Sequence, residues 1–148
     1  MAAQSSIIRV AGSWELGWNT PIKEVDLWET MLRDFDVEEW YMEPVSGIVG
    51  HSVQEVASLE GLVEEHRTLK TPIVFIDEKG KTPLADFKHP KNVLYVLGKA
   101  SYSPLQALGR DGDMSVRIET PAQAALLWPH QAVAIMLYDR MKKLWQQQ

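Results

Sequence analysis

The stretch NVLYVLGKASYSPL, residues Asn92 to Leu105, has the pattern of a strand that runs through a glycine-containing loop into a helix. Its first half is an almost continuous apolar run, which is typical of a strand buried on both faces of a parallel sheet. Ser103 is a favoured N-cap residue, and Pro104 suits the first turn of a helix. Because open parallel sheets bind ligands beyond the carboxyl ends of their strands, this stretch predicts a binding loop at 97–103.

The rest of the chain alternates between strand-like and helix-like segments around this stretch. β-branched and apolar runs predict strands, and apolar residues at helical spacing, with caps such as Thr20 and Gly109, predict helices. The alternation favours a single α/β domain over residues 1–148 with a mostly parallel sheet. The predicted strands cover 6–12, 38–44, 71–77, 92–98 and 114–119, the predicted helices cover 20–35, 53–69, 103–109 and 129–146, and 78–83 is expected to be a turn that uses the backbone freedom of Gly80.

Composition narrows the possible classes of protein. The chain has 148 residues, of which 45% are hydrophobic, and this is enough for one well-filled core. It has no cysteine, which excludes disulfides, iron–sulfur clusters, thiolate zinc sites and a cysteine nucleophile. His51, His66 and His89 show no metal-ligand spacing, so no metal site is expected. No basic segment followed by an apolar run opens the chain and no window suits a membrane span, so we expect a cytoplasmic protein without membrane contact.

Charge is distributed unevenly along the chain. The net charge of −5 argues against a general polyanion binder, so any contact with nucleic acid is expected to be local. Acidic residues crowd 34–44 and 58–66, whereas lysines gather in a later stretch. These lysines suit either an ordinary solvated surface or an edge that faces phosphates. They are Lys79, Lys81, Lys88, Lys91 and Lys99.

Three segments of the second half, VLYVLGKASYSPL, SVRIETP and ALLWPHQAVAIMLYDRM, resemble the C-terminal half of the SPOUT superfamily of trefoil-knot RNA methyltransferases. The branch it most resembles is the small single-domain one that methylates ribose 2′-hydroxyls in tRNA. In the first half, GWNTPIKEVDLWETMLRDFDVEEWYMEP is similar to that branch's NTG turn, helix and strand ending in EP. IDEKGKTPLADFKHPKNVLYVLG is similar to its TTKGTP turn before the cofactor strand. The resemblance covers most of the chain through short motifs.

This resemblance implies an α/β fold with a C-terminal trefoil knot, a homodimer, and RNA, expected to be tRNA, as substrate. It also implies that three loops of the knot bind S-adenosylmethionine mainly through backbone groups, with the active site completed across the dimer. Gly98 would let the backbone approach the cofactor, and apolar side chains would wall the adenine. The alternative is that Gly98 forms only a tight turn and the leucines belong to the core. The implied cofactor-binding residues are Leu97, Gly98, Ile118, Thr120, Pro121, Leu126, Leu127 and Trp128.

The sequence departs from the family pattern where the chemistry is expected. Asn19, an implied substrate-binding residue, and Thr20 match the NTG turn, but Pro21 follows them. Val25 occupies the position of the family's arginine on the first helix, and the glutamate and arginine that follow the cofactor strand are missing from 98–103. One alternative is therefore a catalytically degenerate binding protein on the same scaffold. Another is an unknotted, flavodoxin-like nucleotide binder.

Other residues could supply the missing functions. Histidine is the side chain that most often serves as a general base, and His130 lies at the start of the last helix, so it is the candidate general base. Lys23, on the first helix, and Lys99, in the cofactor loop, could hold substrate phosphate, and Lys23 is also a catalytic candidate. The alternatives are a solvated surface lysine in both cases and a polar helix start for His130.

The last helix carries more apolar residues than one buried face requires. Ile135, Met136 and Trp145 lie outside its main apolar stripe, and a chain of this size would struggle to cover them all. This surplus predicts a twofold-symmetric dimer that uses the helix. Cations near its carboxyl end, where they suit the helix dipole, are Arg140, Lys142 and Lys143.

Overall fold

A computed structural model of the chain describes residues 6–13, 21–43, 53–98, 102–121 and 129–145. In these residues seven strands form one sheet, and every pair of neighbouring strands is parallel. The α/β class and the parallel sheet are therefore as predicted. The strands are β1 (Ile7–Ser13), β2 (Glu39–Glu43), β3 (Gln54–Glu55), β4 (Ile73–Ile76), β5 (Thr82–Pro83), β6 (Asn92–Leu97) and β7 (Met114–Arg117), in the spatial order β3-β2-β1-β6-β4-β7-β5.

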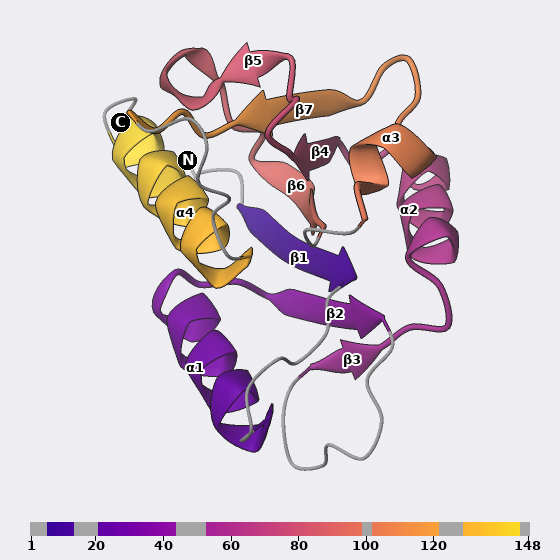
Figure 1. Ribbon diagram of the computed structural model, residues 1–148, viewed down its shortest axis with the longest axis vertical. Helices are drawn as coiled ribbons and strands as arrows, with labels where there is room; N and C mark the ends of the chain where they lie inside the picture. The colour runs from indigo at the N-terminus through magenta and orange to yellow at the C-terminus, as the bar shows by residue number, and fades with distance from the viewer. Residues whose placement is uncertain (1–5, 14–20, 44–52, 99–101, 122–128, 146–148) are drawn as a thin grey trace, which may run out of the picture.

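Helices cover both faces of this sheet. Figure 1 shows α1 and α4 on one side and α2 and α3 on the other. Two separate clusters of buried side chains, one on each face, agree with this arrangement. Because both faces are covered, the central strands have no polar face, as the apolar run of β6 predicts. The helices are α1 (Pro21–Asp34), α2 (Leu59–Thr68), the 3-10 turn η1 (Leu84–Asp86), α3 (Pro104–Leu108) and α4 (Pro129–Trp145).

The start and end of α3 follow the sequence prediction closely. The Ser103 hydroxyl oxygen accepts a hydrogen bond from the Gln106 backbone N–H at 3.2 Å, so Ser103 is the N-cap. Pro104 occupies the first turn, where its missing N–H costs nothing. The Gly109 N–H donates to the Leu105 carbonyl at 3.0 Å and ends the helix.

Two short strands were not predicted. Residues 54–55 were expected to be helical, but they form β3 at one edge of the sheet. The helix begins only at Leu59, because extended Ser58 caps it by accepting a hydrogen bond from the Gly61 N–H at 3.0 Å. Residues 82–83, expected within a turn, form β5 at the opposite edge, where Pro83 is tolerated because an edge strand need not donate on both sides.

The turn before β5 needs Gly80 for a reason that differs from the predicted one. A Cβ at this position would lie 2.3 Å from the carbonyl carbon of Val116 in β7. Real Cβ atoms do not approach a backbone so closely, so the turn can press against β7 only because residue 80 has no side chain. Close approach to β7, and not an unusual backbone angle, is therefore what requires a glycine here.

The core on the α1–α4 face is built from apolar residues at helical spacing on both helices. Val25, Trp28 and Leu32 of α1 are buried there, as are Val133 and Leu137 of α4. Met136 belongs to this core as well, with 0% of its side chain exposed, so the expectation that it lies on the free face of the last helix is wrong. Ile135, Tyr138 and Trp145 remain exposed on that face.

A buried polar network ties α4 to the segment before β6. The His89 ring contacts the Tyr95 hydroxyl through Nδ1 and the Asp139 carboxylate through Nε2, each at 2.7 Å. The Arg140 guanidinium donates to the Tyr95 hydroxyl oxygen at 3.2 Å and to the Lys91 carbonyl at 2.8 Å. Arginine can only donate, so the Tyr95 hydroxyl is free to donate to Nδ1, and neutral His89 then carries its proton on Nε2 and donates to Asp139.

This network corrects the expectation for Arg140. The sequence placed it among cations that serve the helix dipole, but its side chain is 2% exposed and binds the backbone carbonyls of Pro90 and Lys91. Lys143 acts similarly, because its ammonium group donates to the carbonyls of Leu84 and Phe87. The carboxyl half of α4 is thus fixed to residues 84–91 by charged groups that satisfy backbone oxygens.

No helix in the described ranges is both long and apolar enough to cross a membrane. Nor do the described residues bring three or more histidine, aspartate or glutamate side chains together in a way that could hold a metal ion.

Candidate functional site

The candidate site lies at the carboxyl edge of the central strands. Leu97, the last residue of β6, pairs with Gly12 of β1 on one side and with Ile76 of β4 on the other. Ile76 in turn pairs with Val116 of β7. The strands therefore end at the same level, and the segments that leave β4, β6 and β7 start from one edge, where ligands of such sheets bind.

Gly98 is held against the chain that follows it. A Cβ at this position would lie 2.4 Å from the Tyr102 carbonyl oxygen and 2.5 Å from Cδ of Pro104. Only glycine fits, because both neighbours are backbone or proline ring and cannot move aside cheaply. Gly98 itself is half-buried, and Leu97 is buried in the core of the α1–α4 face.

Asp77 is a polar residue at this edge that the sequence reasoning missed. It directly follows β4, and its backbone N–H donates to the Val116 carbonyl at 3.0 Å. Its carboxylate accepts a hydrogen bond from the Lys79 backbone N–H at 2.8 Å and another from the Ser103 hydroxyl at 2.6 Å. An acidic residue that ends a buried strand was the available signal, but the identity of the strand next to it could not be read from the sequence.

The end of β7 carries a further set of hydrogen bonds. The Arg117 guanidinium donates to the carbonyls of Gly80 and Lys81 at 3.0 and 3.1 Å and pairs with Glu119 at 3.0 Å. Ile118 packs against the core cluster of the α1–α4 face, to which Leu97 also belongs. The predicted cofactor residues beyond it are half-buried Thr120 and exposed Pro121.

His130, the candidate base, lies in the first turn of α4 and packs against α1. Its ring is edge-on to the Trp28 indole, with 6.3 Å between the centroids and 81° between the planes. Trp28 stacks on Trp40 of β2 at 6.2 Å. His130 thus contacts Trp28, which belongs to the same core cluster as Leu97.

The position of the family's arginine lies in the core. Val25 has 0% of its side chain exposed and packs between α1 and the sheet. Lys23 is in the first turn of α1, but its side chain lies outside the described part of the structure. Five other predicted site residues lie outside the described part of the structure, and their assignments stay predictions: Asn19, Lys99, Leu126, Leu127 and Trp128. The implied knot would pass through 99–101 and 122–128, which are also outside the described residues, so the knot stays a prediction as well.

Tyr102 is an aromatic residue that lies close to Gly98 at this edge. Burial raises the pKa of its hydroxyl, and the negative charges of Glu43 and Glu60 raise it further. Tyr102 packs against the core cluster of the α2–α3 face, and its carbonyl oxygen lies directly against Gly98. Its hydroxyl therefore stays protonated and acts as a hydrogen-bonding group, not as a charge.

Of the lysines singled out in the sequence, the described ones are all exposed. Lys79 and Lys81 flank Gly80 in the turn between β4 and β5, which Arg117 and Asp77 hold in place. They lie at the same edge as Gly98, whereas Lys88 and Lys91 precede β6 and lie at its amino end. A solvated surface and a phosphate-facing edge both remain compatible with Lys79 and Lys81.

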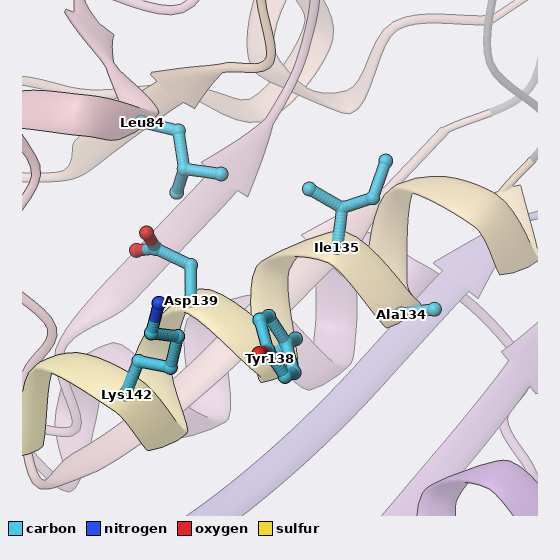
Figure 2. Close-up of a pocket in the computed structure, with 6 residues that line it drawn as sticks. All are labelled: Leu84, Ala134, Ile135, Tyr138, Asp139 and Lys142. Carbon is cyan, nitrogen blue, oxygen red and sulfur yellow. The ribbon is translucent and has the colours of Figure 1, made fainter. Parts of the chain in front are cut away.

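Two open hollows lie away from this edge. One, of about 460 Å³, runs along the exposed face of α4, and Figure 2 shows its lining side chains, five from α4 and Leu84 opposite them. The other, of about 440 Å³, lies at the amino ends of β4 and β7 and includes Arg67, Lys70 and Arg110. In the second hollow the two arginines are paired with acidic side chains, because Arg67 pairs with Asp113 and both arginines pair with Glu64.

The fold of this chain is similar to that of solved RNA methyltransferase structures, although no match is found by sequence. No protein-family model matches the chain. No curated protein matches it by sequence. Among solved structures it is similar to the SpoU methyltransferase AviRb from Streptomyces viridochromogenes in complex with AdoMet, with a TM-score of 0.71 and 17% identity over 96% of this chain and 59% of that one.

Two further structures extend the likeness. An AdoMet-bound rRNA methyltransferase from Sinorhizobium meliloti has a TM-score of 0.73 and 13% identity, over 95% of this chain and 58% of that one. A structure described as giving insights into the 2-OH methylation of C/U34 on tRNA has a TM-score of 0.72 and 11% identity, over 94% of this chain and 97% of that one. This chain spans about 60% of the length of AviRb and nearly all of the tRNA-modifying protein.

Proposed function

We propose that this chain, whose fold is that of the SpoU-type RNA methyltransferases, binds S-adenosylmethionine at the carboxyl edge of β6 and β7 and methylates a ribose 2′-hydroxyl of RNA. The observation that carries the proposal is the common level at which β1, β6, β4 and β7 end, beside Gly98, against which the following chain packs closely. The likeness to AdoMet-bound structures with the same fold supports this choice of cofactor.

The residues at this edge fit an adenosine-containing ligand. Leu97 is buried while Gly98, Ile118 and Thr120 are half-buried, so apolar side chains and partly exposed backbone lie at one edge. Main-chain amides and carbonyls can match the polar edge of an adenine, and the apolar side chains can cover its faces. The remaining proposed cofactor residues are Pro121, Leu126, Leu127 and Trp128.

When bound, S-adenosylmethionine supplies a methyl group that its sulfonium already activates. Transfer breaks the carbon–sulfur bond and forms a carbon–oxygen bond, so the ribose hydroxyl must release one proton. His130 accepts that proton in this proposal, because a neutral imidazole is an effective base near neutral pH. Lys23, Lys99 and Asn19 hold the RNA backbone, the first two by charge.

The substrate proposed is tRNA. The tRNA-modifying structure is matched over almost its whole length, whereas AviRb and the rRNA methyltransferase carry additional chain beyond the matched part. The acidic net charge of −5 argues against broad affinity for nucleic acid and favours local contacts with one RNA.

A homodimer is part of the same proposal. The exposed face of α4 carries four residues at helical spacing: Ile135, Tyr138, Lys142 and Trp145. The three large hydrophobic residues among them are substantially exposed, Ile135 at 39%, Tyr138 at 53% and Trp145 at 64%. Ile135, Tyr138 and Lys142 of this face line an open groove together with Leu84, as Figure 2 shows. A twofold axis across α4 would cover both stripes at once.

Radiolabelled methyl donor offered with bulk tRNA and, separately, with rRNA tests the reaction. We expect label in tRNA, recovered after digestion as 2′-O-methylated nucleosides. Label on a base would contradict the 2′-O assignment. If the chain binds S-adenosylmethionine but labels no RNA, the catalytically degenerate reading, which the buried Val25 at the family's arginine position favours, replaces the enzyme.

A further inference from the structure

Asp77, which follows β4, contacts two other parts of the carboxyl edge that are far from it in the sequence. Through its backbone Asp77 is bonded to Val116 of β7, and through its side chain it accepts a hydrogen bond from Ser103, the N-cap of α3. Because Ile76 pairs with Leu97, the residue after each of them, Asp77 and Gly98, lies at the same level of the sheet. Asp77 therefore joins the end of β7 to the start of α3, the helix that follows β6.

Ser103 uses its hydroxyl for two purposes. The oxygen accepts a hydrogen bond from the Gln106 N–H at 3.2 Å, while the hydroxyl proton goes to Asp77 at 2.6 Å. A hydroxyl donating to a carboxylate is a charge-assisted hydrogen bond, which is about twice as strong as a neutral one. The start of α3 is thus fixed to the end of β4.

The fixed position of Ser103 determines what Gly98 faces. Tyr102 and Pro104, on either side of Ser103, are the two residues that would collide with a Cβ at position 98. Releasing Ser103 would let this segment move away from Gly98 or over it, and would change the backbone surface at the strand end.

We infer that Asp77 is a positioning residue, which acts through Ser103 to hold the Tyr102–Pro104 segment against Gly98 in the geometry that S-adenosylmethionine requires. The inference rests on the proposed function, since it concerns the same edge. A binding site gains affinity when its backbone is held in place before the ligand arrives, because less ordering is left to do on binding.

The chain provides a matched control in the same turn. The Ser115 hydroxyl oxygen accepts a hydrogen bond from the Lys81 N–H at 2.8 Å, on the far side of Gly80 from Asp77. Ser115→Ala removes one side-chain hydrogen bond from this turn and leaves Ser103 untouched. Asp77→Asn is the conservative variant, because its amide oxygen can still accept from the Lys79 N–H while the Ser103 hydroxyl loses its anionic acceptor.

The test measures S-adenosylmethionine binding by calorimetry for wild type, Asp77→Ala, Asp77→Asn, Ser103→Ala and Ser115→Ala. We expect Kd to rise about tenfold or more in Asp77→Ala, less in Asp77→Asn, and not at all in Ser115→Ala. Adding Ser103→Ala to Asp77→Ala should raise Kd no further than the larger single effect, because the two residues act through one contact. Hydrogen exchange of the ligand-free protein should show faster exchange at Gln106 in Asp77→Ala than in Ser115→Ala.

Two outcomes overturn the inference while leaving the proposed function intact. One is normal binding by Asp77→Ala, and the other is full additivity of the Asp77→Ala and Ser103→Ala effects. Failure of the wild-type chain to bind S-adenosylmethionine is a different result, which overturns the proposed function and this role of Asp77 with it.

Discussion

The imidazole of His130 meets the indole of Trp28 edge-on, with 6.3 Å between the ring centroids, and so joins the first turn of α4 to the middle of α1. Trp28 is itself stacked on Trp40 of β2. The proposed general base is therefore braced by a rigid aromatic pair, and this restricts the directions from which a substrate hydroxyl can reach it. A base held in place in this way contributes more than one on a free loop.

His130→Ala should lower the rate of RNA methylation by about a hundredfold or more, the usual size for loss of one general base, while S-adenosylmethionine binds as before. Single-turnover kinetics with labelled donor measure the rate, and calorimetry measures binding. His66→Gln is the control, since His66 is buried on the other face of the sheet. An unaffected rate in His130→Ala would leave the enzyme standing and remove His130 as its base.

A charge placed on the exposed stripe of α4 should produce monomers. Ile135→Asp puts a carboxylate into the groove shown in Figure 2, where a dimer would have to bury it unpaired. Sedimentation at micromolar concentration should show a dimer for wild type and a monomer for the variant. Leu69→Asp, at a more exposed apolar position directly after α2, should remain dimeric. A monomeric wild type would contradict the proposed interface.

Tyr95→Phe should destabilise the fold by about 1–2 kcal/mol, because it removes the hydroxyl that His89 and Arg140 share inside the core. The burial of this hydroxyl also raises its pKa to about 12. Urea unfolding at a fixed protein concentration measures the change. Leu69→Ala, at an exposed position outside the proposed dimer face, is the control and should stay within about 0.5 kcal/mol of wild type. Equal stabilities of the two variants would mean that the network adds nothing.

Stability should fall as the pH drops below about 6.5. Burial lowers the pKa of both His66 and His89 from the ordinary 6.5, so the unfolded chain takes up protons before the folded one does. The contribution of these residues is therefore complete above the unfolded pKa and is lost as the pH decreases from there. Urea unfolding between pH 7.5 and 5.5 should show this slope, and a double His66→Gln, His89→Gln variant should flatten it. An equally steep slope in that variant would assign the loss to other groups.

Local signals in the sequence were enough for the main strands and helices. The apolar run of β6 and the Ser103–Pro104 helix start each depend on neighbours along the chain, and both are confirmed. The edge strands β3 and β5 are two residues long and exist only because β2 and β7 pair with them, so their own residues carry no signal. Gln54–Glu55 lies in a stretch of helical composition and was predicted wrongly for that reason.

The candidate site was harder to predict because its contacts join distant segments. Nothing near Asp77 in the sequence indicates that Ser103 will be its partner, since the contact depends on β4 lying beside β6. Arg140 was assigned to the helix dipole because its position near the end of α4 was the only signal in the sequence. Its burial depends on contacts with residues 90–91, which the order of the strands brings close to α4. Gly98, by contrast, was recognisable as a special position, although the structure shows that its own chain already requires the glycine.

Calorimetric titration of the wild-type chain with S-adenosylmethionine tests the central claim most directly. We expect saturable binding with one site per chain, lost when Gly98→Val forces Tyr102 and Pro104 away from the strand end, and nearly unchanged in Lys99→Ala. Absence of binding heat for the wild type at millimolar cofactor, or equal loss of binding in the two variants, would contradict the placement of the cofactor at this edge.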